Sequence, residues 1–355
     1  MPANETVRLE SGKVEPAVSV IIPARNEEVS LTTCLESLVS QTGVEFEVIV
    51  VDDHSTDRTR EVASSLIGAH ESKLRVVEAG PLPAGWTGKN NAITTGVHDA
   101  RGEWLLFTDA DTVHLPGSLA RALAEAREHR VDLLSYSPEQ IAVTFWEMAV
   151  LPVVFAELAR QYPPSKVSDP NSPLAAANGQ YILVKREAYD AVGGHASVAG
   201  EILEDVALAR AFKATGRKIR FRYAADAVRT RMYRNWRQLR DGWTKNLALL
   251  FPRPGWLAAR SMFLWATPWA IAFLVPILSG KDWWLSPLFV GAFLWLTWRL
   301  KRANFTSDMT FLGALFGMPM FAYLLLRSKF AHAKGKVPWK GRMYSDKGHS
   351  LATDH

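Results

Sequence analysis

Two carboxylates separated by one residue, Asp109 and Asp111, follow the apolar run 104–107 and are the residues best suited to chemistry in this sequence. Side chains alternate along a strand with a period of two, so we expect both carboxylates to point to the same side where the strand ends. Two hard oxygen ligands suit Mg²⁺ or Mn²⁺, and a diphosphate can supply further ligands. The spacing therefore predicts a metal site, with a polar turn after a buried strand as the alternative.

Two earlier apolar runs, 18–22 and 46–51, are also followed by polar residues and then by a helix-forming segment. The order strand, helix, strand, helix predicts an α/β fold with a mostly parallel sheet flanked by helices. Ligands bind at the carboxyl ends of the strands in such sheets, although each polar residue taken singly could be a helix cap or a solvated turn residue. The residues expected at this edge are Arg25, Glu27, Asp53, Asp109 and Asp111.

Three motifs then occur in one order: Val-Ser-Val-Ile-Ile-Pro-Ala-Arg-Asn-Glu at 18–27, Val-Asp-Asp-His-Ser-Thr-Asp at 51–57, and Asp-Ala-Asp at 109–111. Together they resemble the inverting family 2 glycosyltransferases, which have the Rossmann-like GT-A fold. Further segments resemble the membrane-attached branch that includes hopanoid-associated and carotenoid glycosyltransferases. These segments are 83–89, 203–205, 231–233 and 242–246, and the resemblance covers roughly residues 16–345.

The resemblance implies a role for each matching residue. Asp53 would bind the base of a nucleotide-diphosphate sugar donor, and Asp109 and Asp111 would hold the Mg²⁺ or Mn²⁺ that neutralises the leaving diphosphate. Asp205, preceded by Glu204, would be the catalytic base; the alternative is a helix N-terminal carboxylate. The catalytic residues implied are Asp205 and Glu204, the metal ligands are Asp109 and Asp111, and the residues that bind the nucleotide sugar are Pro23, Arg25, Glu27, Asp53, Lys89, Asp109, Arg231, Trp243 and Lys245.

These residue types suit the implied reaction. A divalent cation stabilises the charge that develops on the leaving oxygen, and a carboxylate can take the proton from an attacking hydroxyl. An acceptor that is itself a carboxylate needs no base at neutral pH. Processive relatives carry Gln-x-x-Arg-Trp after the base, whereas the nearest match here is the stretch from Gln238 to Trp243. The sequence therefore favours the transfer of a single sugar.

The last third of the chain predicts attachment to a membrane. Three apolar runs rich in tryptophan, 261–279, 283–298 and 309–326, suit a multi-pass protein, with Trp283 and Trp284 among the interfacial anchors. A single cysteine and an N-terminus without a signal peptide place the catalytic domain on the cytoplasmic side of the cell membrane. Three crossings would put the basic tail outside, against the positive-inside rule, so one run is expected to be re-entrant or interfacial.

The division of the chain and its partners follow from this arrangement. A cluster of basic residues at 217–240 lies close to the first apolar run, so we expect it to bind anionic lipids and not nucleic acid. The apolar stretch 141–159 contains Glu147 and Glu157 and is expected to be an interfacial helix. The predicted parts are a mobile tail at 1–15, a GT-A domain at 16–236, a juxtamembrane segment at 237–257, membrane helices at 258–326 and a basic tail at 327–355.

The short distance from Asp205 to the first apolar run predicts a membrane lipid as the acceptor, of terpenoid type such as a hopanoid or a carotenoid. The alternatives are a polyprenyl-phosphate glycosyltransferase, a transferase anchored beside soluble acceptors, and a membrane scaffold without catalysis. A scaffold would be expected to have lost Asp109, Asp111 or Asp205, and all three are present. A Rossmann oxidoreductase is disfavoured because no Gly-x-Gly-x-x-Gly follows either early strand.

Overall fold

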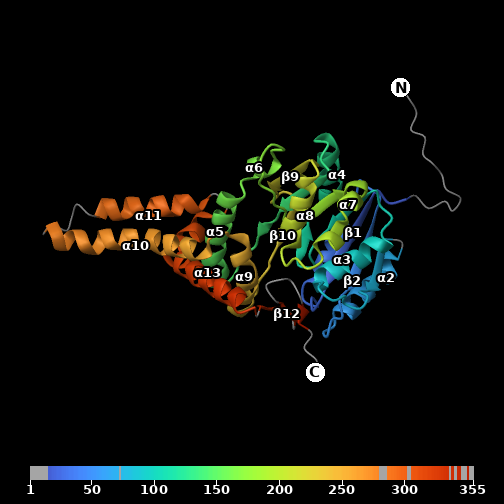
Figure 1. Ribbon diagram of the computed structural model, residues 1–355, viewed down its shortest axis with the longest axis horizontal. Helices are drawn as coiled ribbons and strands as arrows, with labels where there is room; N and C mark the ends of the chain where they lie inside the picture. The colour runs from blue at the N-terminus through green and yellow to red at the C-terminus, as the bar shows by residue number, and fades with distance from the viewer. Residues whose placement is uncertain are drawn as a thin grey trace.

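The computed structural model describes residues 15–71, 73–279, 286–301, 305–335, 337–339, 342–344 and 350–351. A central sheet and its helices form the body, and two antiparallel helices project from it, α10 (Pro254–Ser279) and α11 (Ser286–Leu300) (Figure 1). The predicted mobile tail at 1–15 lies, except for Glu15, outside the described residues, as do Trp283, Trp284 and much of the predicted basic tail beyond residue 335.

The main sheet has seven strands in the order β3-β2-β1-β4-β8-β6-β9. Only β8 runs antiparallel to its neighbours, so the predicted mostly parallel α/β sheet is confirmed. The strands are β1 (Val18–Ala24), β2 (Phe46–Asp52), β3 (Leu74–Glu78), β4 (Trp104–Phe107), β6 (Leu133–Ser137), β8 (Ile182–Lys185) and β9 (Ile219–Tyr223).

Helices cover both faces of this sheet because its buried strands carry apolar side chains on both sides. Val20 and Ile22 of β1 belong to one apolar cluster, and Ile21 between them belongs to another. The first cluster is completed by α1 (Leu31–Val39), α2 (Thr59–His70) and α4 (Ser118–Glu128), and the second by α3 (Gly88–Asp99), α7 (Arg186–Ala191) and α8 (Glu204–Ala214). The smaller elements are β5 (Thr112–His114), β7 (Glu139–Gln140), β10 (Val228–Thr230), β11 (Val337–Trp339), β12 (Arg342–Tyr344), β13 (Ser350–Leu351), α6 (Pro164–Ser168) and η1 (Gly194–Val198).

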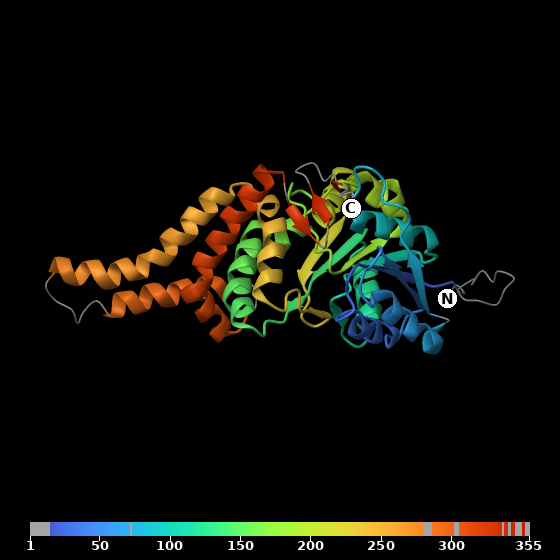
Figure 2. The same ribbon diagram turned by 90° about the horizontal axis from the view of Figure 1, so that it is seen from below.

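A second, wholly helical region lies between the sheet and the projecting pair (Figure 2). It consists of α5 (Phe145–Gln161), α9 (Trp236–Leu250), α12 (Ser307–Leu312), the π-helical segment η3 (Gly313–Gly317) and α13 (Met318–Ala333). These helices share a third apolar core, in which Phe155 of α5, Leu247 of α9 and Phe321 of α13 are buried. A segment from the middle of the predicted 16–236 domain, α5, therefore belongs to the helical region.

The stretch predicted as an interfacial helix, 141–159, forms α5, but most of this helix is internal. Every residue from Ala149 to Glu157 is buried, because α13 and η3 pack against it. The interfacial prediction is wrong for this part, and only the first turn, with Phe145 and Trp146, is exposed. Gly317 allows the close packing, since a Cβ atom at this position would overlap the carbonyl oxygen of Ala149.

The apolar C-terminal segments differ in their surroundings. In the part of the chain that the structure describes, one helix, Ser307–Ala333, is long and apolar enough to cross a membrane, and half of its most apolar window is buried inside the protein. The projecting helices instead expose large apolar side chains, among them Phe263 (71% exposed) and Phe273 (66%) of α10 and Leu294 (60%) of α11. Hydropathy alone does not distinguish these two situations.

The basic stretch 217–240 does not form the free basic surface that the sequence predicts. Most of its arginines are paired with a carboxylate, in several cases one that is distant in sequence, so part of their charge is neutralised within the protein. Arg220 and Arg222, for example, both reach Glu125 of α4. The other pairs join Arg217 to Asp132, Arg222 also to Asp226, Arg229 to Glu139, Arg231 to Glu147, and Arg237 and Arg240 to Asp241.

Candidate active site

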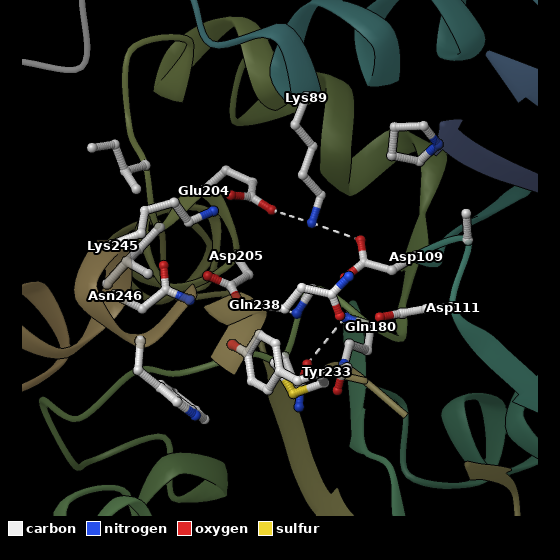
Figure 3. Close-up of a pocket in the computed structure, with 18 of the residues that line it drawn as sticks. Lys89, Asp109, Asp111, Gln180, Glu204, Asp205, Tyr233, Gln238, Lys245 and Asn246 are labelled. Carbon is white, nitrogen blue, oxygen red and sulfur yellow. Dashed lines mark hydrogen bonds and ion pairs between the residues drawn. The ribbon is translucent and has the colours of Figure 1, made fainter. Parts of the chain in front are cut away.

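A pocket of about 1100 Å³ opens at the carboxyl ends of the central strands and is closed on its far side by α9 and α13. The sequence-predicted site residues come together here from seven parts of the chain. Figure 3 labels six of them, among them Lys89, Asp109 and Asp205. The predicted residues line this one pocket without exception: Pro23, Arg25, Glu27, Asp53, Lys89, Asp109, Asp111, Glu204, Asp205, Arg231, Trp243 and Lys245. Their placement agrees with the prediction, and their roles remain predictions.

The loops that follow β1 and β2 form one wall and hold each other in place. The Arg25 guanidinium donates to the backbone carbonyls of Asp53 (2.5 Å) and His54 (3.2 Å). Asn26 accepts a hydrogen bond from the Thr56 amide at 2.8 Å. Asn26 and His54 both have φ of 54°, a left-handed conformation that Asn and His adopt more readily than most residues. The backbone at Asp53 is thus held by Arg25, and the residue is buried at the pocket wall.

Asp109 and Asp111 lie in the turn between β4 and β5, because β4 already ends at Phe107. Strand alternation is therefore not the cause of their shared direction, although both do line the pocket. The turn is held by Thr112, whose hydroxyl donates to the carbonyl of Asp109 at 2.8 Å. Behind it lies His114, whose pKa burial lowers to about 3, so its ring is neutral and adds no positive charge beneath the carboxylates.

Lys89 is the cation at the centre of the pocket. Its Nζ lies 2.8 Å from Oδ1 of Asp109 and 2.6 Å from Oε1 of Glu204. Burial alone would lower the pKa of Lys89, but these two carboxylates raise it well above its usual value, so the ammonium stays charged. Lys89 lies in the first turn of α3, which Thr87 caps by accepting from the amide of Asn90. The structure therefore excludes an ordinary solvated loop lysine here.

Asp205 lies at the start of α8, with Glu204 beside it. Its Oδ2 accepts a hydrogen bond from the Gly179 amide at 2.9 Å, which orients the carboxylate. Burial and the neighbouring Glu204 raise the pKa of Asp205 to about 6, although Lys89 opposes this shift. Gly179 has no side chain, which leaves room for the Lys89 ammonium: a Cβ atom at position 179 would lie 3.0 Å from Nζ of Lys89. Glu204 is held by Lys89, which leaves Asp205 as the better candidate for a base.

The far wall combines structural and pocket-facing groups. The ring of Trp243 is buried and meets Phe155 and Tyr233 edge-on, so most of this side chain is core. Nε of Arg231 lies 3.1 Å from Oε1 of Glu147, so a diphosphate would have to compete with this carboxylate. Lys245 points toward the acidic side of the pocket in Figure 3.

Sequence reasoning missed several residues of the pocket. Tyr233 and Asn246 lie within motif segments that carry the family resemblance, so that signal could have found them. Gly179 and Gln180 precede β8 without any motif, and Arg327 follows an apolar run some eighty residues beyond α9. Only the fold brings these three to the site.

The carboxylate oxygens at this site suit a divalent cation that is also bound by the phosphates of a substrate. Among the described residues, no group of three or more His, Cys, Asp or Glu side chains is gathered to hold a metal. Two carboxylates in one turn, next to a pocket large enough for a nucleotide, match the way Mg²⁺ is usually bound, by one or two carboxylates and the phosphates of a substrate. Asp109 and Asp111 therefore fit a metal that binds together with its ligand.

Comparison with known proteins gives consistent similarities. The family described as "Glycosyl transferase family 2" matches residues 19–193. The 4,4'-diaponeurosporenoate glycosyltransferase of Staphylococcus aureus strain MRSA252 is 31% identical over 350 residues, which cover 93% of this chain and 88% of that protein. A protein of the same name from strain USA300 is 29% identical over 348 residues, with the same coverage.

Among solved structures, a mannosyltransferase of Pyrobaculum calidifontis in complex with GDP-Man and Mn²⁺ is 18% identical and aligns with a TM-score of 0.49. The alignment covers 90% of this chain and 87% of that one. The similarity to the S. aureus proteins is the stronger of the two, and it extends over the sheet and the helical region alike.

Proposed function

Because this chain belongs to glycosyltransferase family 2, we propose that it transfers a single sugar, with inversion, from a nucleotide-diphosphate sugar to a membrane lipid of terpenoid type. The observation that carries the proposal is the pairing of two groups across one pocket. Asp109 and Asp111 face the pocket from one side, and Asp205, held by the Gly179 amide, faces it from the other.

The donor would bind along the ends of β1, β2 and β4. Asp53, which lines the pocket, would accept a hydrogen bond from the N–H of a base such as uracil or guanine. Asp109 and Asp111 would hold Mg²⁺ or Mn²⁺, which when bound supplies positive charge for the leaving diphosphate. Lys89 contacts Asp109 and Glu204 at once, so it can hold the acidic side chains of both walls at a fixed separation while the donor binds.

With a hydroxyl acceptor, Asp205 would take the proton from the attacking oxygen, whereas a carboxylate acceptor would need no base. A general base works best when its pKa lies near the working pH, and burial raises the pKa of Asp205 to about 6. The Gly179 amide fixes one of its oxygens. A positioned carboxylate and a single displacement would invert the configuration at the sugar.

The acceptor is inferred from the relatives and from the rim of the pocket. The relatives act, by their name, on 4,4'-diaponeurosporenoate, whose ending denotes a carboxylate. At the rim, Asp241 is flanked by Arg240 at 2.8 Å and by Arg327 and Arg237 at 4.0 Å. One carboxylate among three guanidinium groups leaves positive charge at the pocket, which suits an acceptor with an anionic head group. We therefore favour a carotenoid-like carboxylate over a hopanoid hydroxyl.

For the membrane, we propose that α10 and α11 enter the bilayer as a hairpin while α12 and α13 remain with the body. The support is the exposed apolar surface of the projecting pair and the internal packing of α13. Two crossings return the chain to the side of the catalytic sheet. A basic tail on the cytoplasmic side then satisfies the positive-inside rule, which three crossings would violate. Extraction with carbonate should leave the protein in the membrane fraction, and its release would contradict insertion.

Incubation of native membranes with radiolabelled sugar nucleotides and the purified protein tests the reaction. We expect label in the organic phase, in a product that carries one sugar, and none with the Asp111→Asn variant. A labelled lipid that contains phosphate and releases its sugar on mild acid treatment would favour the polyprenyl-phosphate alternative. Label confined to water-soluble products or to long polymers would contradict a lipid acceptor.

A further inference from the structure

We propose that three arginines at the base of the projecting hairpin form a binding site for the phosphate of an anionic phospholipid head group. They are Arg160 of α5, Arg260 of α10 and Arg299 of α11, and they surround the carboxylate of Glu157. This inference rests on the membrane insertion of α10 and α11 proposed above, and it assigns a lipid contact to residues that the reaction does not use.

The geometry of the cluster brings three helices to one carboxylate. Nε of Arg160 lies 2.8 Å and Nη2 of Arg260 lies 2.6 Å from Oε2 of Glu157, and Nη2 of Arg299 lies 3.7 Å from Oε1. Only 9% of the Glu157 side chain is exposed. Each arginine keeps part of its side chain accessible, between 18% and 35%. The carboxylate is thus the floor of the cluster, and the guanidinium groups are its outer surface.

The cluster carries more positive charge than it neutralises. In the described part of the chain, Glu157 is the one carboxylate within ion-pair distance of any of these arginines. Three guanidinium groups hold about fifteen N–H donors, far more than one carboxylate can accept. Nε of Arg260 is buried without a hydrogen-bond partner among the described residues. A phosphate has the charge and the number of acceptor oxygens that the cluster lacks.

Aromatic residues place the cluster at the level of a membrane surface. The guanidinium of Arg260 lies 5.3 Å from the ring centre of Trp256, and that of Arg299 lies 5.7 Å from that of Trp295. Both tryptophans and Trp298 are exposed, as is typical of residues at the interface between head groups and acyl chains. Beyond the cluster, 261–279 and 286–298 contain no charged residue. From Arg260 to the end of α10 the helix rises about 28 Å, close to the thickness of the hydrocarbon layer.

The alternative is an ion-pair cluster that only joins three helices. The two explanations, an ion-pair cluster and a head-group site, predict different effects of the Glu157→Gln substitution. A purely structural cluster would lose stability in any lipid, because three cations would repel one another. A head-group site would instead bind an anionic lipid more tightly, because the phosphate no longer shares the arginines with a carboxylate.

The full chain, purified in a mild detergent, is titrated with phosphatidylglycerol or phosphatidylcholine, and bound lipid is measured by native mass spectrometry and by thermal stabilisation. We expect preference for phosphatidylglycerol, a loss of about fivefold in affinity for each of Arg260→Gln and Arg299→Gln, and a gain for Glu157→Gln. Arg217→Gln is the matched control, because Arg217 has similar exposure and a one-to-one partner in Asp132.

Unchanged preference in the Arg260→Gln and Arg299→Gln variants, or weaker phosphatidylglycerol binding by Glu157→Gln, would overturn the site. If inorganic phosphate stabilises the protein as well as phosphatidylglycerol does, the cluster binds a free anion and not a lipid head group. Carbonate extraction of the same variants tests the proposed insertion separately. A protein that stays in the membrane fraction but binds phosphatidylglycerol no better than phosphatidylcholine contradicts the head-group site and leaves the insertion standing.

Discussion

Two charged clusters of this protein have opposite imbalances. In the acidic part of the pocket, Lys89 lies between Asp109 and Glu204, with Asp111 and Asp205 on the same walls. At the base of the hairpin, the single carboxylate of Glu157 lies among three arginines. An isolated excess of charge is costly to bury, so each cluster is expected to meet a ligand of opposite charge. The first fits a divalent cation, and the second fits a phosphate.

The comparison also separates what each cluster does for stability from what it does for function. Some ion pairs of this protein match their charges one to one, as Arg217 and Asp132 do. A surplus that persists next to accessible space is better explained by binding. Variants that change one charge in one cluster and leave the second cluster unchanged can test this explanation.

The largest effect is expected for Asp111→Asn, which removes charge from the acidic cluster. Transfer should fall to background while the fold persists, because the Asp111 side chain lines the pocket and lies outside the apolar cores. Initial rates with added Mg²⁺ or Mn²⁺ and a melting curve check both parts. Asp226→Asn, in an exposed carboxylate away from the pocket, is the control and should keep normal activity. Full activity of the wild type in excess chelator would contradict a metal at this site.

If the acceptor is a hydroxyl, Asp205→Asn should lower turnover by about 10²–10⁴-fold with little change in donor binding. With such an acceptor, turnover of the wild type should fall as the pH drops through about 6, because the protonated carboxyl cannot accept a proton. A pH profile of kcat and a donor titration measure these effects. If the acceptor is a carboxylate, the loss should be smaller.

The same substitution should also affect stability: it should lower turnover but make the folded protein more stable. The pKa of Asp205 is raised in the folded protein, so the ionised carboxylate opposes folding above pH 6. Asp205→Asn should therefore melt at a higher temperature than the wild type at pH 8, and the difference should shrink as the pH falls below 6. A variant that is less stable at pH 8 would make Asp205 a structural residue.

Asp53→Ala should weaken nucleotide binding by about 1.5–3 kcal/mol, the value of a hydrogen bond to a charged group. Metal preference should not change, because Asp53 lies at the end of β2 and the predicted metal ligands follow β4. Calorimetry with the nucleoside diphosphate measures the change. Unaltered affinity would remove Asp53 from the donor site.

The smallest effect is expected in the helical region, where Gly317→Ala should lower the free energy of unfolding by about 1–3 kcal/mol. The new methyl group would overlap the carbonyl of Ala149 and push η3 away from α5. Gly291→Ala in α11 is the matched control, because no atom lies within 4 Å of its new Cβ and helix propensity improves. Equal stability of the two variants would show that the packing of η3 on α5 is loose.

The sequence predicted the sheet well because the sheet depends on local signals; the candidate site residues line one pocket, and their roles remain predictions. Buried strands that end in polar residues indicate a parallel sheet, and its geometry brings Asp53, Asp109 and Lys89 together. The surroundings of apolar helices were harder to predict. Hydropathy does not show whether α5 or α13 faces protein or lipid, and the partners of an arginine can lie a hundred residues away, as Glu157 and Arg260 do. Gly179 enters the site through tertiary packing alone.

The position of α13 has a consequence for the modularity of the enzyme. One face of this helix packs on α10, and at the pocket Arg327 belongs to the wall while the Ser328 hydroxyl donates to the carbonyl of Thr244 in α9. A chain cut after α9 would lose Arg327 and expose the apolar faces of α5 and α9. The catalytic half is therefore not expected to be stable as a detached soluble unit.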